Sequence, residues 1–284
     1  MFMKQEFKQL FPQWIHSVSS NDKLILTNDI DSLFSCAILK ALFGCEVGAF
    51  FDFKTLYNFG TAYKGDQLIG VDCAVEYKDL RTFCNHQTRF NANDRVNPNS
   101  ANPNSVQTYK KYYAKYGMST LMLILSLYDA WDLLLIPGHE ELTYEQKVFL
   151  WAVDSSYKGY TSYPTHTDVY KSHIWYQEML GLDHIVDVLV RHTEPYTSVQ
   201  KTYGLSDHIN VIDGKLHTDI EIEMIQALFP RLDLSLPKEE VIEKCRFDTF
   251  GGTFSYMNKN SINDLFSLAI TSPNYYVCSK LITA

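Results

Sequence analysis

Residues 23–44, KLILTNDIDSLFSCAILKALFG, predict a buried strand that leads directly into a helix. The apolar run LIL is followed by the polar turn TNDIDS, and between residues 32 and 43 apolar side chains recur at the spacing of one helix face. Asp29 and Asp31 lie in the turn. Two explanations fit them: they cap the helix, because Asp is a preferred N-cap residue, or they present carboxylates to a metal ion.

Further apolar stretches at residues 45–53, 67–75 and 81–86 predict more strands of the same sheet. Continuously apolar strands that alternate with helices are typical of a parallel sheet covered on both faces, so the predicted fold class is α/β. We expect a parallel-sheet domain over residues 1–160, a helical connector over 161–235 and a small α+β region over 236–284. Helices are predicted at residues 3–18, 109–135, 144–157, 166–180, 183–192 and 217–229, with breaks near Pro12 and Gly117.

The composition bounds the function. The chain has 284 residues, is 46% hydrophobic and carries a net charge of −8, which argues against long duplex nucleic acid as a partner because that polyanion requires a stripe of Lys and Arg. The six cysteines form no CxxC pair, which favours buried free thiols in a reducing compartment. The sequence lacks a membrane-length apolar run and a signal-peptide core, so it predicts a cytoplasmic protein with no membrane partner.

Acid or imidazole side chains follow three of the predicted strands: Asp29 and Asp31 the first, Asp72 the stretch LIGV, and His86 the stretch RTFCN. Because the carboxyl ends of parallel strands meet at one edge of a sheet, we expect these side chains to converge. Several carboxylates with one imidazole suit Mn²⁺, or Mg²⁺, in a two-metal hydrolase. Each residue alone also has a structural explanation, as a helix cap, a loop contact or a buried polar group.

The order of these motifs resembles that of the DHH phosphoesterases. Residues 26–44 resemble the family's first motif, with the Asn-Asp-x-Asp element of the branch that degrades very short RNAs. The stretches IGVDCAV, FCNHQ and WAVDSSY are similar to the second, third and fourth motifs, and the helix between the last two carries Ser119 and Thr120 at the Ser/Thr element. The resemblance covers residues 23–157.

The resemblance implies a DHH-like domain that binds two metal ions. Its metal ligands would be Asp29, Asp31, Asp72, His86 and Asp154. It further implies a divalent-metal-dependent phosphodiesterase that hydrolyses a short oligonucleotide or a nucleotide signal, with Asp72 as the carboxylate that bridges the ions.

Two residues depart from the Asp-His-His motif: Asn85 stands in place of Asp, and Gln87 in place of the second His. Gln87 can donate a hydrogen bond to a phosphate but cannot transfer a proton, and such a loss typically slows an enzyme 10²–10⁴-fold. We therefore expect His86 and Gln87 to act at the reacting phosphate. The alternatives are a DHH-like protein that binds a nucleotide or a partner protein without turnover, and an interaction protein in which the acidic site is only structural.

The loop after His86 supplies the candidate substrate contacts. Residues 87–107 hold six asparagines and two prolines, and such a long loop within a compact domain is often functional. We expect Asn85, Arg89 and Arg95 to contact the substrate phosphate, because Arg pairs bidentately with phosphate oxygens. The following stretch, YKKYYAKY at residues 109–116, fits either base stacking with phosphate contact or a solvated helix face with aromatic packing.

Overall fold

The computed structural model describes residues 2–60, 67–253 and 259–282. The strands are β1 Lys23–Thr27, β2 Glu46–Phe51, β3 Thr55–Phe59, β4 Leu68–Val71, β5 Arg81–Phe83, β6 Ser100–Ala101, β7 Ile209–Ile212, β8 Lys215–Thr218, β9 Val241–Thr253, β10 Leu265–Ser272 and β11 Tyr275–Leu281. The α-helices are α1 Gln5–Lys8, α2 Ile30–Phe43, α3 Pro103–Val106, α4 Thr120–Tyr128, α5 Tyr144–Ala152, α6 Lys158–Thr161, α7 Thr167–Leu180, α8 Glu194–Thr202 and α9 Ile222–Leu228. Short 3₁₀ helices are η1 Gln13–His16, η3 Tyr77–Asp79, η4 Tyr112–Ala114, η5 Trp131–Leu134, η6 Val153–Ser155, η7 Asp183–Val188 and η8 Lys259–Ser261.

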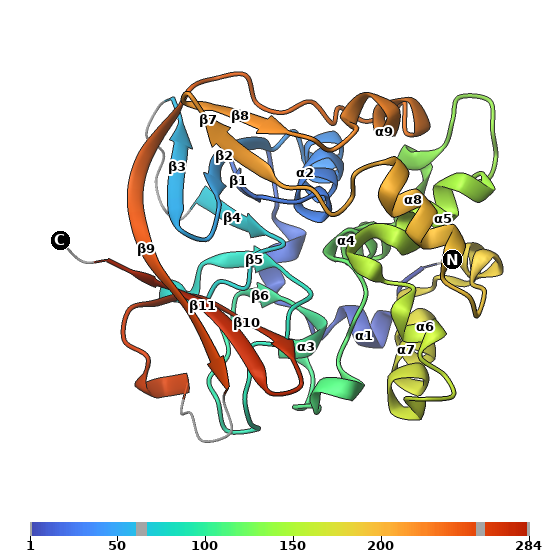
Figure 1. Cartoon of the computed structure of the whole chain (residues 1–284), viewed down its shortest axis with the longest axis horizontal. Coiled ribbons are helices and arrows are strands. Elements are labelled where there is room, and N and C mark those ends of the chain that lie inside the picture. The colour runs from blue at the N-terminus through green and yellow to red at the C-terminus, as the bar shows by residue number, and fades with distance from the viewer. Residues whose placement is uncertain (1, 61–66, 254–258, 283–284) are drawn as a thin grey trace.

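One curled sheet of nine strands organises the chain, in the order β10-β11-β9-β3-β2-β1-β4-β5-β6. The strands from β2 to β6 along this order, β2-β1-β4-β5-β6, are parallel, whereas β3, β9, β11 and β10 add antiparallel pairs at the other end. The predicted α/β class is therefore confirmed. Figure 1 shows the helices α4 to α8 gathered on one side of the molecule and the strands β9 to β11 on the other.

The two faces of the parallel strands are covered differently. Side chains of one face, such as Leu26, Phe50 and Val71, belong to the main core with α2 and α4. The opposite face packs in a second cluster against C-terminal aromatic side chains, among them Phe247 and Phe266. The alternating burial follows from the period of a strand, in which successive side chains point to opposite faces. Both faces are thus covered, one by helices and the other by the C-terminal strands.

The C-terminal residues belong to the same sheet as the rest of the chain. Strand β9 pairs with β3 and links it to β11 and β10. A buried ion pair between Lys259 Nζ and Glu76 Oε1, at 2.8 Å, ties the region to the connection after β4. The division into residues 1–160, 161–235 and 236–284 stays a prediction. The part over residues 161–235 is not purely helical, because it contains the hairpin of β7 and β8.

Several elements differ from their predicted extents. The helix expected over residues 109–135 begins only at Thr120, where the Ser119 hydroxyl caps α4 by accepting from Met122 N–H at 3.1 Å. Strand β8 occupies the start of the helix predicted over 217–229. Strand β3 was not predicted, nor was β6 inside the asparagine-rich loop. Residues 249–256, TFGGTFSY, are strand-like in sequence; they form the end of β9 up to Thr253, and residues 254–256 lie outside the described residues.

All six cysteines are free thiols, and only Cys245 among them is not buried. In the described part of the chain no helix is both long enough and apolar enough to cross a membrane.

Candidate functional site

Ser32 fastens the ends of two adjacent parallel strands. Its hydroxyl accepts a hydrogen bond from Thr27 N–H at the end of β1 and donates one to the Val71 carbonyl at the end of β4, each at 2.8 Å. The residue is fully buried, so both bonds satisfy backbone groups that water cannot reach. The turn after β1 is therefore held beside the residue that follows β4, Asp72.

Asp29 is the N-cap of α2. Its backbone is extended, and its carboxylate accepts from Ser32 N–H at 2.9 Å. The capping explanation of this turn is thus confirmed for Asp29. The preceding residue is fixed from a distant part of the chain, because the Asn28 carbonyl accepts from Ile209 N–H at 2.9 Å at the start of β7.

Asp31 caps a different helix from the one that contains it. Its two carboxylate oxygens accept from the backbone N–H groups of Thr120 and Leu121, both at 2.7 Å. These are the first residues of α4, whose N-terminal amides have no partners within the helix. The side chain is 2% exposed, so a buried carboxylate occupies the positive end of the helix dipole.

Asp72 lies at the centre of the acidic residues. It follows β4 in a left-handed backbone conformation with φ of 53°, which Asp tolerates better than most residues and which is common at functional sites. Its carboxylate accepts from the Thr120 hydroxyl at 2.6 Å.

The carboxyl groups raise one another's pKa values. Burial is the largest cause for Asp29, Asp31 and Asp72, and neighbouring carboxylates raise each pKa further. The pKa of Asp72 rises to about 7. Asp154 contributes to all three shifts, so four of the predicted ligands lie within electrostatic reach of one another. Ionising all of these carboxyl groups together is therefore unfavourable unless a positive charge lies beside them.

His86 completes the set predicted from the strand ends. Its Nδ1 atom lies 3.8 Å from Asp72 Oδ1 and 3.4 Å from Cys84 Sγ. Burial lowers the pKa of His86, which favours the neutral imidazole. The neutral ring is the form that can bind a metal ion through nitrogen.

Asp154 is contributed by η6, which directly follows α5. It has a left-handed backbone with φ of 50° and is exposed to solvent. Asn85 Nδ2 donates to Asp154 Oδ2 at 2.6 Å and to the Met118 carbonyl at 3.0 Å, while Asn85 Oδ1 is buried without a hydrogen-bond partner. Asn85 therefore acts as a donor that orients Asp154.

Two asparagines of the long loop hold the backbone of Asn85 and His86 in place. Asn104 Nδ2 donates to the carbonyl of Asn85, and Asn102 Nδ2 donates to that of His86, each at 2.7 Å. The loop predicted to be functional therefore supports the backbone that carries His86.

The predicted phosphate contacts are engaged within the protein. Gln87 Nε2 donates to the Lys110 carbonyl at 3.1 Å, and Arg89 Nη2 donates to the carbonyls of Asn104 and Gln107 at 2.8 and 2.9 Å. Both side chains are buried and line a cavity of about 290 Å³ with residues of the tyrosine-rich stretch. The exposed Arg95 forms an ion pair with Asp79. A role for these three residues in substrate binding stays a prediction.

Two charged residues near the acids were not predicted from the sequence. Lys115 follows η4 and lies within electrostatic reach of His86 and Asp154. His208 precedes β7 and contributes to lowering the pKa of Asp29, against the larger effect of burial. Lys115 lies in the tyrosine-rich stretch at residues 109–116, whose mixture of Lys and Tyr is visible in the sequence. No sequence signal marks His208, because only the hydrogen bond between Ile209 of β7 and Asn28 brings it near Asp29.

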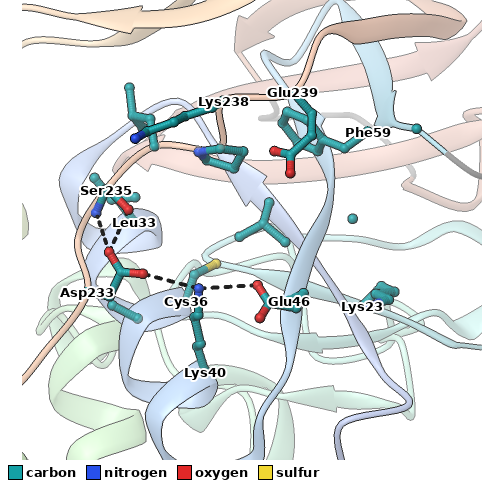
Figure 2. A pocket seen from close by; sticks show the side chains of 16 residues that line it. Lys23, Leu33, Cys36, Lys40, Glu46, Phe59, Asp233, Ser235, Lys238 and Glu239 are labelled. Atoms are coloured by element: carbon teal, nitrogen blue, oxygen red, sulfur yellow. Dashed lines mark hydrogen bonds and ion pairs between the residues drawn. The ribbon is translucent and has the colours of Figure 1, made fainter.

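A second cavity, of about 570 Å³, lies along α2 and includes Lys23 at the start of β1. Figure 2 shows Lys40 between two acids, with Nζ 3.3 Å from Glu46 Oε2 and 3.2 Å from Asp233 Oδ2. Because Lys23 begins the strand that ends near Asp29, the cavity extends to the amino end of the parallel strands. The positive charges of its lysines are balanced by the negative charges of its acidic side chains.

The donor chemistry of the acidic residues suits a divalent cation, but their arrangement is not that of a formed metal centre. Within residues 2–60, 67–253 and 259–282, no group of three or more His, Cys, Asp or Glu is placed to hold one metal ion. Hydrogen bonds to Ser32, Thr120, Leu121 and Asn85 instead occupy some of the carboxylate oxygens. Each oxygen has two lone pairs, so these bonds leave acceptor capacity at every carboxylate.

Compared with protein-family models, with curated proteins and with solved structures, the chain matches none of them. The resemblance of residues 23–157 to the DHH phosphoesterases therefore stays a prediction.

Proposed function

We propose that this protein is a divalent-metal-dependent phosphoesterase, with a short oligonucleotide or a small nucleotide as its substrate. The observation that carries the proposal is the placement of Asp29 and Asp72 after adjacent parallel strands, with Asp72 joined through Thr120 to the carboxylate of Asp31. Asp31 and Asp154 add charge to the same place. Such a cluster is costly to bury unless protons or cations neutralise it.

The residues fit Mn²⁺ or Mg²⁺ by their ligand chemistry, because carboxylate oxygens with one imidazole nitrogen suit hard divalent cations with a preference for Mn²⁺. The residues that would hold two ions are Asp29, Asp31, Asp72, His86 and Asp154. When bound, such ions supply an activated water and neutralise charge on a phosphoryl group. The raised pKa values of Asp29, Asp31 and Asp72 favour protonated carboxyl groups, so metal binding would release protons.

The surrounding residues would fix the positions of these ligands. Thr120 and Asn85 each donate a hydrogen bond at 2.6 Å to a carboxylate of the cluster, which orients Asp72 and Asp154. Partners that orient metal ligands in this way typically contribute 10–100-fold to metal affinity or activity. His86 would remain neutral and keep a nitrogen lone pair for the ion.

Binding without turnover is the second candidate function. The observation that favours it is the placement of Gln87, whose amide donates to the carbonyls of Lys110 and Arg89. A glutamine in this position cannot transfer a proton to a leaving group. In this case the protein would hold a nucleotide at the same acids without hydrolysing it.

One experiment separates the two functions. The protein is loaded with Mn²⁺, its metal content is measured by mass spectrometry, and hydrolysis of bis(p-nitrophenyl) phosphate and of a dinucleotide is followed. We expect Asp72→Asn to lower turnover at least 100-fold. Asp233→Asn, the same substitution in the cavity along α2, serves as the matched control and should retain full activity.

The outcomes are distinct. Mn²⁺-dependent turnover that is lost only in Asp72→Asn supports the phosphoesterase. Mn²⁺-dependent nucleotide binding with no turnover supports the binding protein. A protein that takes up neither metal nor nucleotide would contradict both functions.

A further inference from the structure

Lys115 is a half-buried cation that an aromatic ring holds in place. It directly follows η4, and its Nζ atom lies 4.7 Å from the centre of the Tyr112 ring. The ring is itself fixed, because the Tyr112 hydroxyl donates to the Thr271 carbonyl at 2.9 Å on β10. A lysine over an aromatic face gains a modest attraction and keeps its charge.

Hydrogen bonds tie the segment that carries this ammonium group to the acidic residues. Tyr116 N–H donates to Asn104 Oδ1 and Asn104 Nδ2 donates to the Asn85 carbonyl, each at 2.7 Å, and Asn85 Nδ2 donates to Asp154. Burial lowers the pKa of Lys115, and Asp154 acts against that shift by raising it. In the opposite direction, Lys115 contributes to lowering the pKa of His86. The two effects agree with the placement of this segment beside Asn85 and Asp154.

The lysine is close to the acids without forming an ion pair with them. Among the described residues, no carboxylate oxygen lies within 4.0 Å of Lys115 Nζ. Its hydrogen-bond donors are therefore not used by Asp154. An ammonium group that is partly desolvated and not ion-paired beside a cluster of acids is suited to binding an anion.

The neighbouring arginine does not offer the same capacity. Arg89 Nη2 donates to two backbone carbonyls, at 2.8 and 2.9 Å, and the Arg89 guanidinium lies 5.7 Å from the centre of the Tyr109 ring. Arg95 pairs with Asp79. Of the three cations considered for phosphate contact, Lys115 alone has no carboxylate or carbonyl partner among the described residues.

We propose that Lys115 binds the phosphoryl oxygens of the ligand at this site. The inference rests on the proposed function for the nature of the ligand, a phosphate ester, and assigns the cation that recognises it. A phosphoryl group beside Asp154 and His86 would be repelled by the carboxylates, and the positive charge of Lys115 offsets that repulsion. The residue acts in binding and does not take part in proton transfer.

The test is a titration of adenosine 5′-monophosphate into the Mn²⁺-loaded protein by isothermal titration calorimetry. We expect Lys115→Met to weaken binding about 10- to 100-fold, the range for losing a charged hydrogen bond. Lys115→Arg should retain most of the affinity because it keeps the charge. Lys111→Met, the same change at an exposed position of the same segment, is the control and should bind normally. Thermal unfolding and Mn²⁺ affinity verify that each variant is folded.

Two results would overturn the inference: Lys115→Met binding as tightly as the unaltered protein, or no binding of the monophosphate by the unaltered protein at saturating Mn²⁺. Failure of the proposed function looks different. In that case binding depends on Lys115, yet neither phosphodiester is hydrolysed. Conversely, turnover that is lost in Asp72→Asn but normal in Lys115→Met would retain the phosphoesterase and exclude the lysine.

Discussion

Thr120 joins Asp31 to Asp72, because its backbone N–H donates to Asp31 Oδ2 at 2.7 Å and its hydroxyl donates to Asp72 Oδ1 at 2.6 Å. One residue at the start of α4 thereby links carboxylates that come from two neighbouring strand ends. The helix and the sheet edge form a single unit around the acids.

Removing the Thr120 hydroxyl should loosen Asp72 while leaving Asp31 capped. We expect Thr120→Val to lower Mn²⁺ affinity about 10- to 100-fold, the usual effect of losing a partner that orients a metal ligand. Thr120→Ser keeps the hydroxyl and should bind as the unaltered protein does. Calorimetric Mn²⁺ titrations measure both variants, and equal affinity in Thr120→Val would show that the hydroxyl plays no part in metal binding.

Asn85→Asp should destabilise the metal-free protein. It replaces the amide that donates to Asp154 with a second carboxylate, which loses a hydrogen bond to a charged group and adds repulsion. Because Asp154 is exposed, solvent screens the repulsion, and we expect a loss of about 1–2 kcal/mol in the free energy of unfolding at neutral pH. Added Mn²⁺ should recover part of this loss. Urea unfolding with chelator and with Mn²⁺ measures both effects, and undiminished stability in chelator would contradict the role of Asn85.

The buried ion pair of Lys259 and Glu76 predicts a large effect of a single substitution. Both side chains are less than a tenth exposed, so Lys259→Met leaves a buried carboxylate without its partner and should cost about 3–5 kcal/mol. The double variant Glu76→Leu/Lys259→Met removes both charges and should recover most of that loss. Lys4→Met breaks the exposed pair with Glu178, which solvent screens, and should cost far less than Lys259→Met. Urea unfolding compares the three, and a small effect of Lys259→Met would show that the pair does not fasten the C-terminal strands.

Acid should destabilise the protein through His173. Burial lowers the pKa of this histidine to about 3 from its ordinary 6.5, and its ring packs near Trp151. The unfolded chain therefore binds the proton more readily than the folded chain between these values. The stability contributed by the neutral ring is complete above pH 6.5 and is lost as the pH falls towards 3.

His173→Leu removes this titration. The difference in unfolding free energy between the unaltered protein and the variant should change most between pH 6.5 and 4, measured by urea unfolding over that range. A constant difference would mean that His173 takes up its proton equally in the folded and unfolded chain. The raised pKa values of Asp29, Asp31 and Asp72 act in the opposite sense in both proteins, so they cancel in the comparison.

The strand-to-helix unit around Asp29 was predictable because its signals are local: an apolar run, a cap residue and helical spacing within residues 23–44. Strand β6 was not, because a two-residue strand forms only when the loop around it is fixed by tertiary hydrogen bonds. The start of α4 at Thr120 was not predicted either. Ser119 caps the helix there, but the sequence pattern over residues 109–135 suggested one longer helix.

The site divides in the same way. Asp29, Asp31, Asp72 and His86 follow predicted strands, so their convergence follows from the topology of a parallel sheet. Asp154 was expected only from the family resemblance, since nothing in its local sequence marks it. Lys115 and His208 approach through packing between distant segments, which one sequence does not reveal.

The pairing of β3 with β9 has a consequence for synthesis of the chain. Strand β3 leaves the ribosome well before β9, its neighbour in the sheet, has been made. Until then one edge of β3 has no hydrogen-bonded partner, and the apolar face later covered by Phe247 and Phe266 stays open to water. An open edge beside an apolar face is a site of aggregation, so the nascent chain should depend on chaperones until β9 to β11 are released.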